Sequence, residues 1–294
     1  GRIKNSSHLR SLTNEVLLMP DRSSLRLTVF AVTGFIALSA SQSMGQPNRT
    51  SNFVPVSDAM LQNPAPEDWL MWRRTLDGWG YSPLDQITRD NVGELRMTWT
   101  RAMHSGNQEG TPLAYRGVLY MPNPGDIIQA IDASTGDLIW EHRRDLPEDL
   151  AEFMGGLVTT KRTIALHGDL ILDTTGDDYL QALDATTGEL VWETLVVDYQ
   201  VNPALQTAGP IVADGRVISG RSCRGRATPD ACVITAHDAT TGEELWRRRT
   251  IPGPGEPGDE SWGGVPFEDR KHVGTWMVPS YDPSLQLIYI GTSV

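Results

Sequence analysis

The sequence predicts an all-β fold, a β-propeller of four-stranded antiparallel blades, and three observations lead to this prediction. A segment of thirteen residues recurs with the pattern A-x-D-A-x-T-G-x-x-x-W at residues 129–141, 181–193 and 235–247. Successive copies begin 52 and 54 residues apart, and a period near fifty residues is typical of propellers and related repeat arrays. Gly and Pro number 28 and 19, as expected for many short strands and turns.

Each copy of the repeat predicts a strand, a tight turn and a returning strand. In residues 181–193, Ala-Leu-Asp ends one strand and Thr-Thr-Gly forms the turn, where Gly supplies a positive φ. The returning Glu-Leu-Val-Trp alternates polar and apolar residues. Because an indole buries a large area, we expect Trp140, Trp192 and Trp246 to pack between blades rather than to contact a ligand. The period leaves room for about four short strands in each blade.

Further elements are expected in chain order around these copies. A short helix is predicted to begin near Thr88 or Asp90, and residues 95–100 predict a strand whose Trp99 also packs. Four hairpins follow, with turns at Arg116-Gly117, His167-Gly168, Asp214-Gly215 and Asp282-Pro283. About four blades are therefore expected, the last incomplete. An open half ring would expose unpaired strand edges, so we expect this sequence to be the N-terminal part of a longer chain.

Residues 1–46 are expected to lie outside the fold, and residues 47–294 to form one partial propeller. Arg22 and Arg26 precede the apolar run 27–38, and small residues follow it. This order is typical of a secretory signal peptide, with a membrane-anchoring signal as the alternative. Export predicts a periplasmic location and an oxidising compartment, where Cys223 and Cys232 are expected to form a disulfide.

The composition excludes some classes of partner. The formal net charge is −12, which argues against binding to nucleic acid or to anionic membrane surfaces. We interpret this charge as a contribution to solubility. No Cys-x-x-Cys-His motif occurs in the sequence, so no haem attachment is expected within it.

Three features of the sequence resemble a known family. The repeat looks like the tryptophan-docking repeat of the pyrroloquinoline quinone (PQQ) propellers. Residues 72–95 (WRRTLDGWGYSPLDQITRDNVGEL) resemble the opening segment of the quinoprotein alcohol dehydrogenases, and residues 108–112 (QEGTP) resemble their following E-x-x-P segment. Outer-membrane assembly lipoproteins carry similar blades without a cofactor. The repeat alone therefore leaves a non-catalytic periplasmic scaffold as the alternative.

The resemblance implies an eight-bladed ring with PQQ and a metal ion, usually calcium, at its axis. It implies an exported dehydrogenase that oxidises an alcohol or a sugar and passes two electrons to a cytochrome c or a membrane quinone.

Matched by position, five residues would contact the cofactor. Glu109 and Arg162 would lie near the quinone, Thr207 and Ser222 near its carboxylates, and Trp276 flat beneath the rings. A planar trianion suits an aromatic surface, hydroxyl donors and a guanidinium.

The sequence departs from the family pattern at three places. Gly155-Gly156 stands where adjacent cysteines are expected, and no Glu occurs near Gly225, where a metal-binding Glu is expected. Asp230 is the nearest acid and the candidate metal ligand, while Val294 stands where a metal-binding Asn is expected. The calcium ligands are therefore incomplete. The catalytic base is expected beyond Val294, so the chain alone is expected to be inactive.

Overall fold

A computed structural model of the chain describes residue 50 and residues 52–155, 160–223, 226–271 and 273–293. Residues 46–294 form one compact unit. The predicted signal peptide lies outside the described residues. Among the helices that the structure describes, none has the length and hydropathy needed to cross a bilayer.

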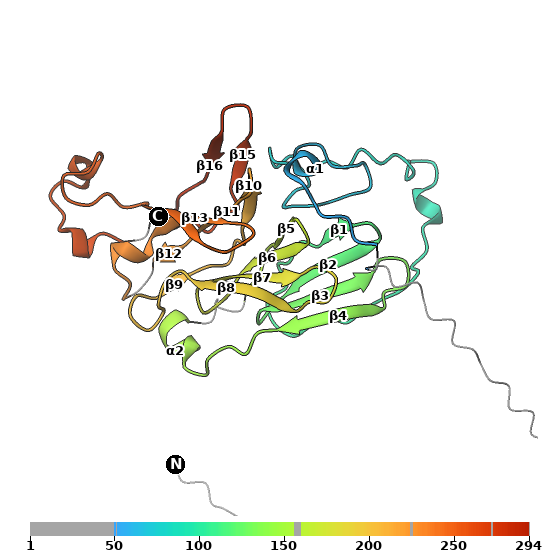
Figure 1. Ribbon diagram of the computed structural model, residues 1–294, viewed down its shortest axis with the longest axis horizontal. Coiled ribbons are helices and arrows are strands. Elements are labelled where there is room, and N and C mark those ends of the chain that lie inside the picture. The colour runs from blue at the N-terminus through green and yellow to red at the C-terminus, as the bar shows by residue number, and fades with distance from the viewer. Residues whose placement is uncertain (1–49, 51, 156–159, 224–225, 272, 294) are drawn as a thin grey trace, which may run out of the picture. The chain divides into compact units, whose positions relative to one another are not determined.

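Three four-stranded antiparallel sheets contain most of the described strands (Figure 1). The first contains β1 (Leu113–Tyr115), β2 (Val118–Asn123), β3 (Ile127–Asp132) and β4 (Leu138–Arg143). The second contains β5 (Ala165–His167), β6 (Leu170–Thr174), β7 (Tyr179–Asp184) and β8 (Leu190–Leu195). The third contains β10 (Ile211–Ala213), β11 (Arg216–Gly220), β13 (Val233–Asp238) and β14 (Glu244–Arg249). We call them blades 1, 2 and 3, and they confirm the predicted fold class.

Two smaller strand pairs complete the described sheet structure. The pair β15 (Ser280–Asp282) and β16 (Leu287–Tyr289) forms a hairpin, as predicted for the start of a fourth blade. The pair β9 (Ala204–Leu205) and β12 (Ser222–Cys223) joins the segment before β10 to the segment after β11. This second pair brings together two segments that carry predicted site residues.

Each repeat copy folds as the sequence predicts. In blade 2, Asp184 ends β7 and its Oδ1 accepts hydrogen bonds from the backbone N–H groups of Thr186 and Thr187, at 2.7 and 2.9 Å. Gly188 follows with φ of 75°, a conformation that residues with a Cβ seldom adopt. The Asp and the Gly of the repeat therefore fix the turn between the last two strands of each blade.

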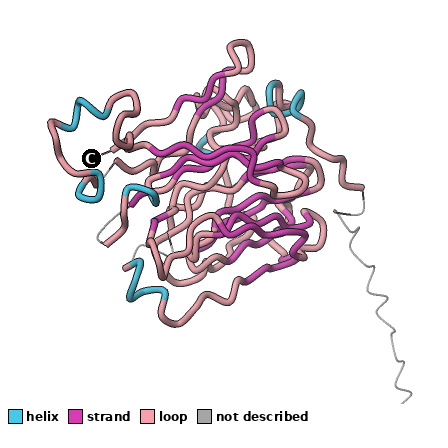
Figure 2. The backbone as a smooth tube through the Cα atoms, turned by 60° about the vertical axis from the view of Figure 1, so that its left-hand side comes forward, coloured by secondary structure: helices cyan, strands magenta, loops and turns pink. Residues whose placement is uncertain are grey.

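Two of the three repeat tryptophans join neighbouring blades, as predicted. The ring of Trp140 packs on Gly188 of the next blade, where an added Cβ would lie 2.5 Å from a ring atom. Trp192 packs on Gly242 with the same 2.5 Å spacing. Figure 2 shows many of the strands running in a similar direction through the body of the molecule. The predicted packing is incomplete for Trp246, which is 39% exposed, because among the described residues the next sheet along the chain is only the two-stranded pair of β15 and β16.

Short helices lie outside the blades. The α-helices are α1 (Asp58–Gln62) and α2 (Leu150–Met154). The 3₁₀-helices are η1 (Val92–Glu94), η2 (Pro229–Ala231), η3 (Asp259–Trp262) and η4 (Phe267–Asp269). The helix expected from Thr88 or Asp90 is therefore only the single 3₁₀ turn η1.

The strand predicted at residues 95–100 is wrong. These residues pair with no described strand, and without a partner an alternating segment has no ladder to join. Trp99 nevertheless packs as expected. Its indole N–H donates to the carbonyl of Ala133 at 3.1 Å, and its ring covers Gly136.

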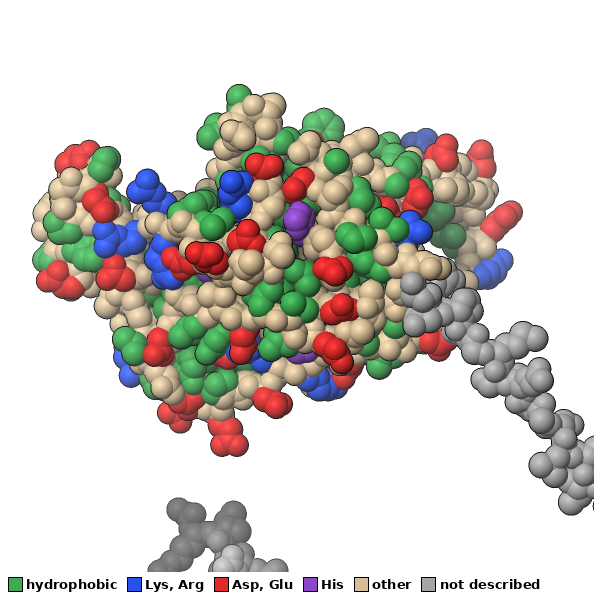
Figure 3. Space-filling view, viewed as in Figure 1, with side chains coloured by type: hydrophobic (Ala, Val, Ile, Leu, Met, Phe, Trp, Pro, Cys, Tyr) green, Lys and Arg blue, Asp and Glu red, His purple; other side chains and the backbone are tan. Residues whose placement is uncertain are grey.

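Acidic side chains are spread over the face of the molecule seen in Figure 3, with Lys and Arg between them. No single acidic patch dominates this face. The distribution agrees with a contribution of the net charge of −12 to solubility.

Candidate functional site

The segments that lead into the first strands of the blades run next to one another. Gln108 forms a parallel bridge with Lys161, and the backbone N–H of Thr111 donates to the carbonyl of Arg162 at 2.8 Å. Gly209 packs so closely on the carbonyl of Thr163 that a Cβ there would overlap it. Side chains carried by these segments in three successive blades are therefore brought together.

Arg162 is the centre of the candidate site. Its Nη2 lies 2.7 Å from Oε2 of Glu109, and its Nη1 donates to the hydroxyl of Thr207. Its guanidinium carbon lies 5.3 Å from the centroid of the Trp276 ring. Four of the five predicted cofactor residues thus meet, although they come from segments far apart in the sequence.

This cluster is partly open to solvent. The side chains of Arg162 and Glu109 are 23% and 41% exposed, so their ion pair contributes at most about 1 kcal/mol to stability. Trp276 is held at one edge, where its N–H donates to Oγ of Ser293 at 2.8 Å. The guanidinium and the indole are therefore oriented yet accessible to a ligand.

Ser222, the fifth predicted residue, is buried and lies beside the Trp276 segment. Gly274 packs directly on the Ser222 hydroxyl, and a Cβ at Gly274 would overlap it. This hydroxyl has no hydrogen-bond partner within the part of the chain that the structure describes. An unpaired buried hydroxyl is costly, and a carboxylate of a ligand would satisfy it. The donor set therefore fits a planar ligand that carries several anionic groups.

The two cysteines form the disulfide Cys223–Cys232, with a Cα–Cα distance of 4.8 Å. Asp230, the candidate metal ligand, instead accepts a hydrogen bond from Nη1 of Arg249 at 3.0 Å. Among the described residues, no group of three or more His, Cys, Asp or Glu side chains is arranged to hold a metal ion. Gly156, Gly225 and Val294 lie outside the described residues. Calcium binding stays a prediction.

Sequence reasoning missed two buried cations that directly precede site residues. Lys161 precedes Arg162, and Arg221 precedes Ser222. Burial would lower the pKa of Lys161, but the nearby carboxylates raise it above its ordinary value, so the amine is charged. One sequence signal could have pointed to them: two repeat copies carry an Asp six residues before the repeat Asp, at Asp126 and Asp178. These two acids pair with Lys161 and Arg221.

Comparisons with known proteins identify the family. The family described as "Glucose/ethanol/alcohol dehydrogenase, beta-propeller domain", with the short name PQQ, matches residues 69–294. The dehydrogenase subunit of the alcohol dehydrogenase (quinone) of Gluconacetobacter polyoxogenes is 33% identical over 246 residues, which cover 77% of this chain and 33% of that protein. The quinohemoprotein alcohol dehydrogenase ADH-IIG of Pseudomonas putida is 32% identical over 239 residues, again 77% and 33% of the two chains.

Solved structures agree with these matches. The quinohemoprotein alcohol dehydrogenase ADHIIG of Pseudomonas putida HK5 superposes with a TM-score of 0.73 at 29% identity, over 82% of this chain and 37% of that one. The enzyme of Comamonas testosteroni gives 0.66 at 27% identity, over 81% and 37%. The chain spans about a third of the length of these relatives. By its sequence match and its blades, the chain belongs to the PQQ family of glucose, ethanol and alcohol dehydrogenases, within their β-propeller domain.

Proposed function

We propose that the protein binds PQQ at the Arg162 cluster and oxidises an alcohol or a sugar. The observation that carries this proposal is the meeting of Glu109, Thr207 and Trp276 at the Arg162 guanidinium. Family membership supports it, since the relatives above are named as quinone-dependent and quinohemoprotein alcohol dehydrogenases.

When bound, PQQ supplies a two-electron acceptor for the oxidation of the substrate. The chain's own residues bind and orient it. Arg162 donates to anionic oxygens and stabilises negative charge that develops there, and Glu109 keeps the guanidinium in its orientation. The hydroxyls of Thr207 and Ser222 donate to carboxylates, and Trp276 offers its ring to a planar ligand.

A non-catalytic scaffold is not favoured. A scaffold has no need for a solvent-accessible guanidinium held over an indole, nor for a buried hydroxyl without a partner. The family of glucose, ethanol and alcohol dehydrogenases also matches across residues 69–294, well beyond the three repeat copies.

The electron acceptor and the location are part of the same proposal. We infer a cytochrome c or a membrane quinone as acceptor, because two relatives are named for quinone and haem-linked activity. The basic and apolar order of residues 22–41 supports export to the periplasm. Cell fractionation followed by mass determination of the mature N-terminus tests export. A cytoplasmic protein with an intact N-terminus would contradict it.

Reconstitution tests the activity. The complete gene product, prepared as apoprotein, is loaded with PQQ together with Ca²⁺ or, since one matched structure is a europium-containing methanol dehydrogenase, with Eu³⁺. We expect PQQ binding and alcohol-dependent reduction of an artificial dye. Absence of PQQ binding, and of activity across alcohols and aldoses with either metal, would overturn the proposal.

A matched pair of variants separates the site from general effects of charge loss. Arg162→Met removes the guanidinium at the cluster, and we expect PQQ affinity to fall by at least 100-fold, about 2.8 kcal/mol at 1.4 kcal/mol per factor of ten. Arg143→Met removes an exposed guanidinium that pairs with Glu141 at 2.7 Å, and PQQ affinity should stay within threefold of the wild type. Equal effects of the two variants would contradict the assignment of Arg162.

A further inference from the structure

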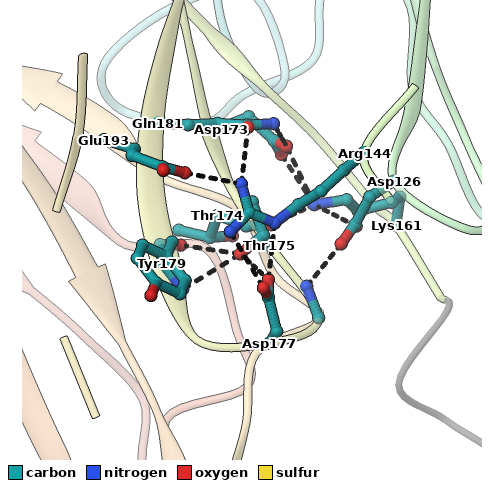
Figure 4. Close-up of polar contacts among 11 residues, drawn as sticks. Asp126, Arg144, Lys161, Asp173, Thr174, Thr175, Asp177, Tyr179, Gln181 and Glu193 are labelled. Carbon is teal, nitrogen blue, oxygen red and sulfur yellow. Dashed lines mark hydrogen bonds and ion pairs between the residues drawn. The ribbon is translucent and has the colours of Figure 1, made fainter. Parts of the chain in front are cut away.

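A buried ion cluster joins blade 1 to blade 2 (Figure 4). Nζ of Lys161, in the segment before β5, lies 2.8 Å from Oδ1 of Asp126, in the loop between β2 and β3. The same Nζ lies 2.8 and 3.0 Å from the two carboxylate oxygens of Asp173, on β6. The three side chains are at most 3% exposed. One cation and two anions therefore lie together away from solvent.

A second buried ion pair joins blade 2 to blade 3. Nε of Arg221, directly after β11, lies 3.1 Å from Oδ1 of Asp178, in the loop between β6 and β7. Nη1 of Arg221 donates to Oγ of Ser219 at 3.2 Å. Both charged side chains are fully buried. At each junction, a cation from one blade thus binds an acid from the blade before it.

The two acids occupy the same position of the repeat. Asp126 and Asp178 each lie six residues before the repeat Asp, and both have positive φ, 55° and 66°. The carbonyl of Asp126 accepts from the N–H of Arg144 and that of Asp178 from Val196, in each case eighteen residues on. Both blades therefore present one buried acid at the same position of the repeat.

Stability alone does not account for these ions. Burying two charges costs several kcal/mol per ion, and apolar replacements of similar size are often as stable or more so. Their places in the chain suggest a different use. Lys161 lies one residue before Arg162, and since neighbouring residues of an extended segment point to opposite sides, fixing Lys161 also fixes the direction of Arg162.

Arg221 holds two parts of the site at once. It directly precedes Ser222, and its carbonyl accepts from both the backbone N–H and the hydroxyl of Thr275, at 3.3 and 3.0 Å. Thr275 directly precedes Trp276. The pair between Arg221 and Asp178 therefore determines where the Ser222 hydroxyl and the Trp276 ring lie.

We propose that Lys161 and Arg221 are positioning residues of the cofactor site, whose ion pairs with Asp126 and Asp178 of the preceding blades hold Arg162, Ser222 and Trp276 in the arrangement that binds PQQ. The proposal rests on the proposed function, and its tests distinguish the two. Arg144 provides a matched control. It pairs bidentately with Asp177 at 2.7 and 2.8 Å across the first junction, but no predicted site residue follows it (Figure 4).

The first experiment measures PQQ affinity on the complete gene product by titration calorimetry. We expect Lys161→Met and Arg221→Met each to weaken PQQ binding at least tenfold, and Arg144→Met to change it less than threefold, although all three lower the melting temperature. Arg221→Lys keeps the positive charge, and its affinity for PQQ should stay within threefold of the wild type. Unchanged affinity in the first two variants, or an equal loss in Arg144→Met, overturns the proposal.

The second experiment uses apoprotein alone, so that it still decides if the protein binds no PQQ. Phenylglyoxal labelling of Arg162, followed by peptide mass spectrometry, should become at least fivefold faster in Lys161→Met, because the guanidinium leaves Glu109 and Thr207. Amide exchange of the peptide that contains Thr275 should likewise accelerate in Arg221→Met. Rates equal to those of the wild type or of Arg144→Met overturn the proposal whatever the cofactor.

A milder variant keeps the test decisive if Lys161→Met does not fold. Asp126→Asn leaves Lys161 paired with Asp173 and preserves the volume of the side chain. We expect it to weaken PQQ binding at least threefold and to accelerate labelling of Arg162 at least twofold. Wild-type values for both quantities in a folded Asp126→Asn protein overturn the role of this ion pair.

Discussion

The junction between blades 1 and 2 and the junction between blades 2 and 3 share their apolar contacts but differ in their polar ones. In both, a repeat Trp covers a turn Gly of the next blade at the same 2.5 Å spacing. In the first, the Trp140 N–H donates to the carbonyl of Ala185 at 3.1 Å. In the second, the Trp192 N–H has no partner among the residues that the structure covers. The repeat thus reproduces packing faithfully and hydrogen bonding only in part.

The first junction also has more polar contacts around its buried cation than the second. Lys161 has two carboxylates, whereas among the described residues Arg221 forms an ion pair only with Asp178. Burial raises the pKa of Asp178 to about 7, against the opposing effect of the Arg221 guanidinium. At the second junction a single carboxylate therefore compensates the buried cation. Removing this carboxylate should destabilise the protein more than removing one of the two carboxylates at the first junction.

The largest expected effect is the difference between Asp178→Asn and Asp126→Asn. At pH 8, where Asp178 is ionised, its replacement leaves Arg221 buried without a carboxylate, at a cost of about 3–5 kcal/mol. Asp126→Asn leaves Lys161 with Asp173 and should cost about 1–2 kcal/mol. Urea unfolding midpoints of the two variants measure the difference. A cost for Asp126→Asn equal to or above that for Asp178→Asn would show that the two junctions are equally compensated.

The shared packing predicts equal effects at the turn glycines. Gly188→Ala and Gly242→Ala should each destabilise the protein by about 2–4 kcal/mol, because the added methyl overlaps a Trp ring at a positive φ. Gly168→Ala is the control, since its φ is 59° but no atom lies within 4 Å of the added Cβ, and it should cost only about 1–2 kcal/mol. Denaturant midpoints give all three values. A clear inequality between Gly188 and Gly242 would break the equivalence of the two contacts.

The hydrogen bond of Trp140 predicts a smaller difference. Trp140→Phe leaves the buried carbonyl of Ala185 without this donor, while Trp192→Phe removes an N–H that has no partner in the described part of the chain. We expect Trp140→Phe to cost about 1 kcal/mol more than Trp192→Phe. Thermal unfolding of both variants under one set of conditions measures the difference. Equal melting temperatures would mean that the N–H of Trp140 contributes nothing.

The smallest effect concerns polar contacts on blade 1. Burial opposes ionisation of Glu141, but hydrogen bonds from Gln129, His104 and Arg143 outweigh it and lower its pKa from 4.5 to about 2. A lowered pKa gives stability that is present above pH 4.5 and is lost as the pH falls toward 2. Because the Glu141 side chain lies at the surface with 20% of its area exposed, and its Arg143 partner is 54% exposed, the contribution is about 1 kcal/mol or less. Unfolding measured between pH 6 and 2.5 should depend less on pH in Glu141→Gln; an unchanged pH profile would contradict the assignment.

Much of the fold could be predicted because the repeat fixes both spacing and turn chemistry. Once the blades are in register, the residues that precede their first strands must be neighbours, so the meeting of Glu109, Arg162 and Thr207 could also be predicted. The strand at residues 95–100 could not, because alternation does not show whether a partner strand exists.

The buried cations were missed for a different reason. Lys is almost never fully buried unless it is paired, and one of the two partners of Lys161, Asp126, lies in another blade, 35 residues earlier. Only the three-dimensional register connects Asp126 with Lys161. A residue whose role depends on a partner in another repeat cannot be recognised within its own repeat.

The buried position six residues before the repeat Asp has one more occupant. In blade 3 it is Cys232, six residues before Asp238. Its carbonyl accepts a hydrogen bond from the N–H of Thr250 at 2.9 Å, eighteen residues later, which is the same separation as for the carbonyls of the two acids. There a covalent bond to Cys223, next to Ser222, replaces the ion pair. The backbone hydrogen bond is kept although φ is −81° at Cys232 and positive at both acids. One position of the repeat thus accepts either an ion pair or a disulfide as the link to the cofactor-site segments.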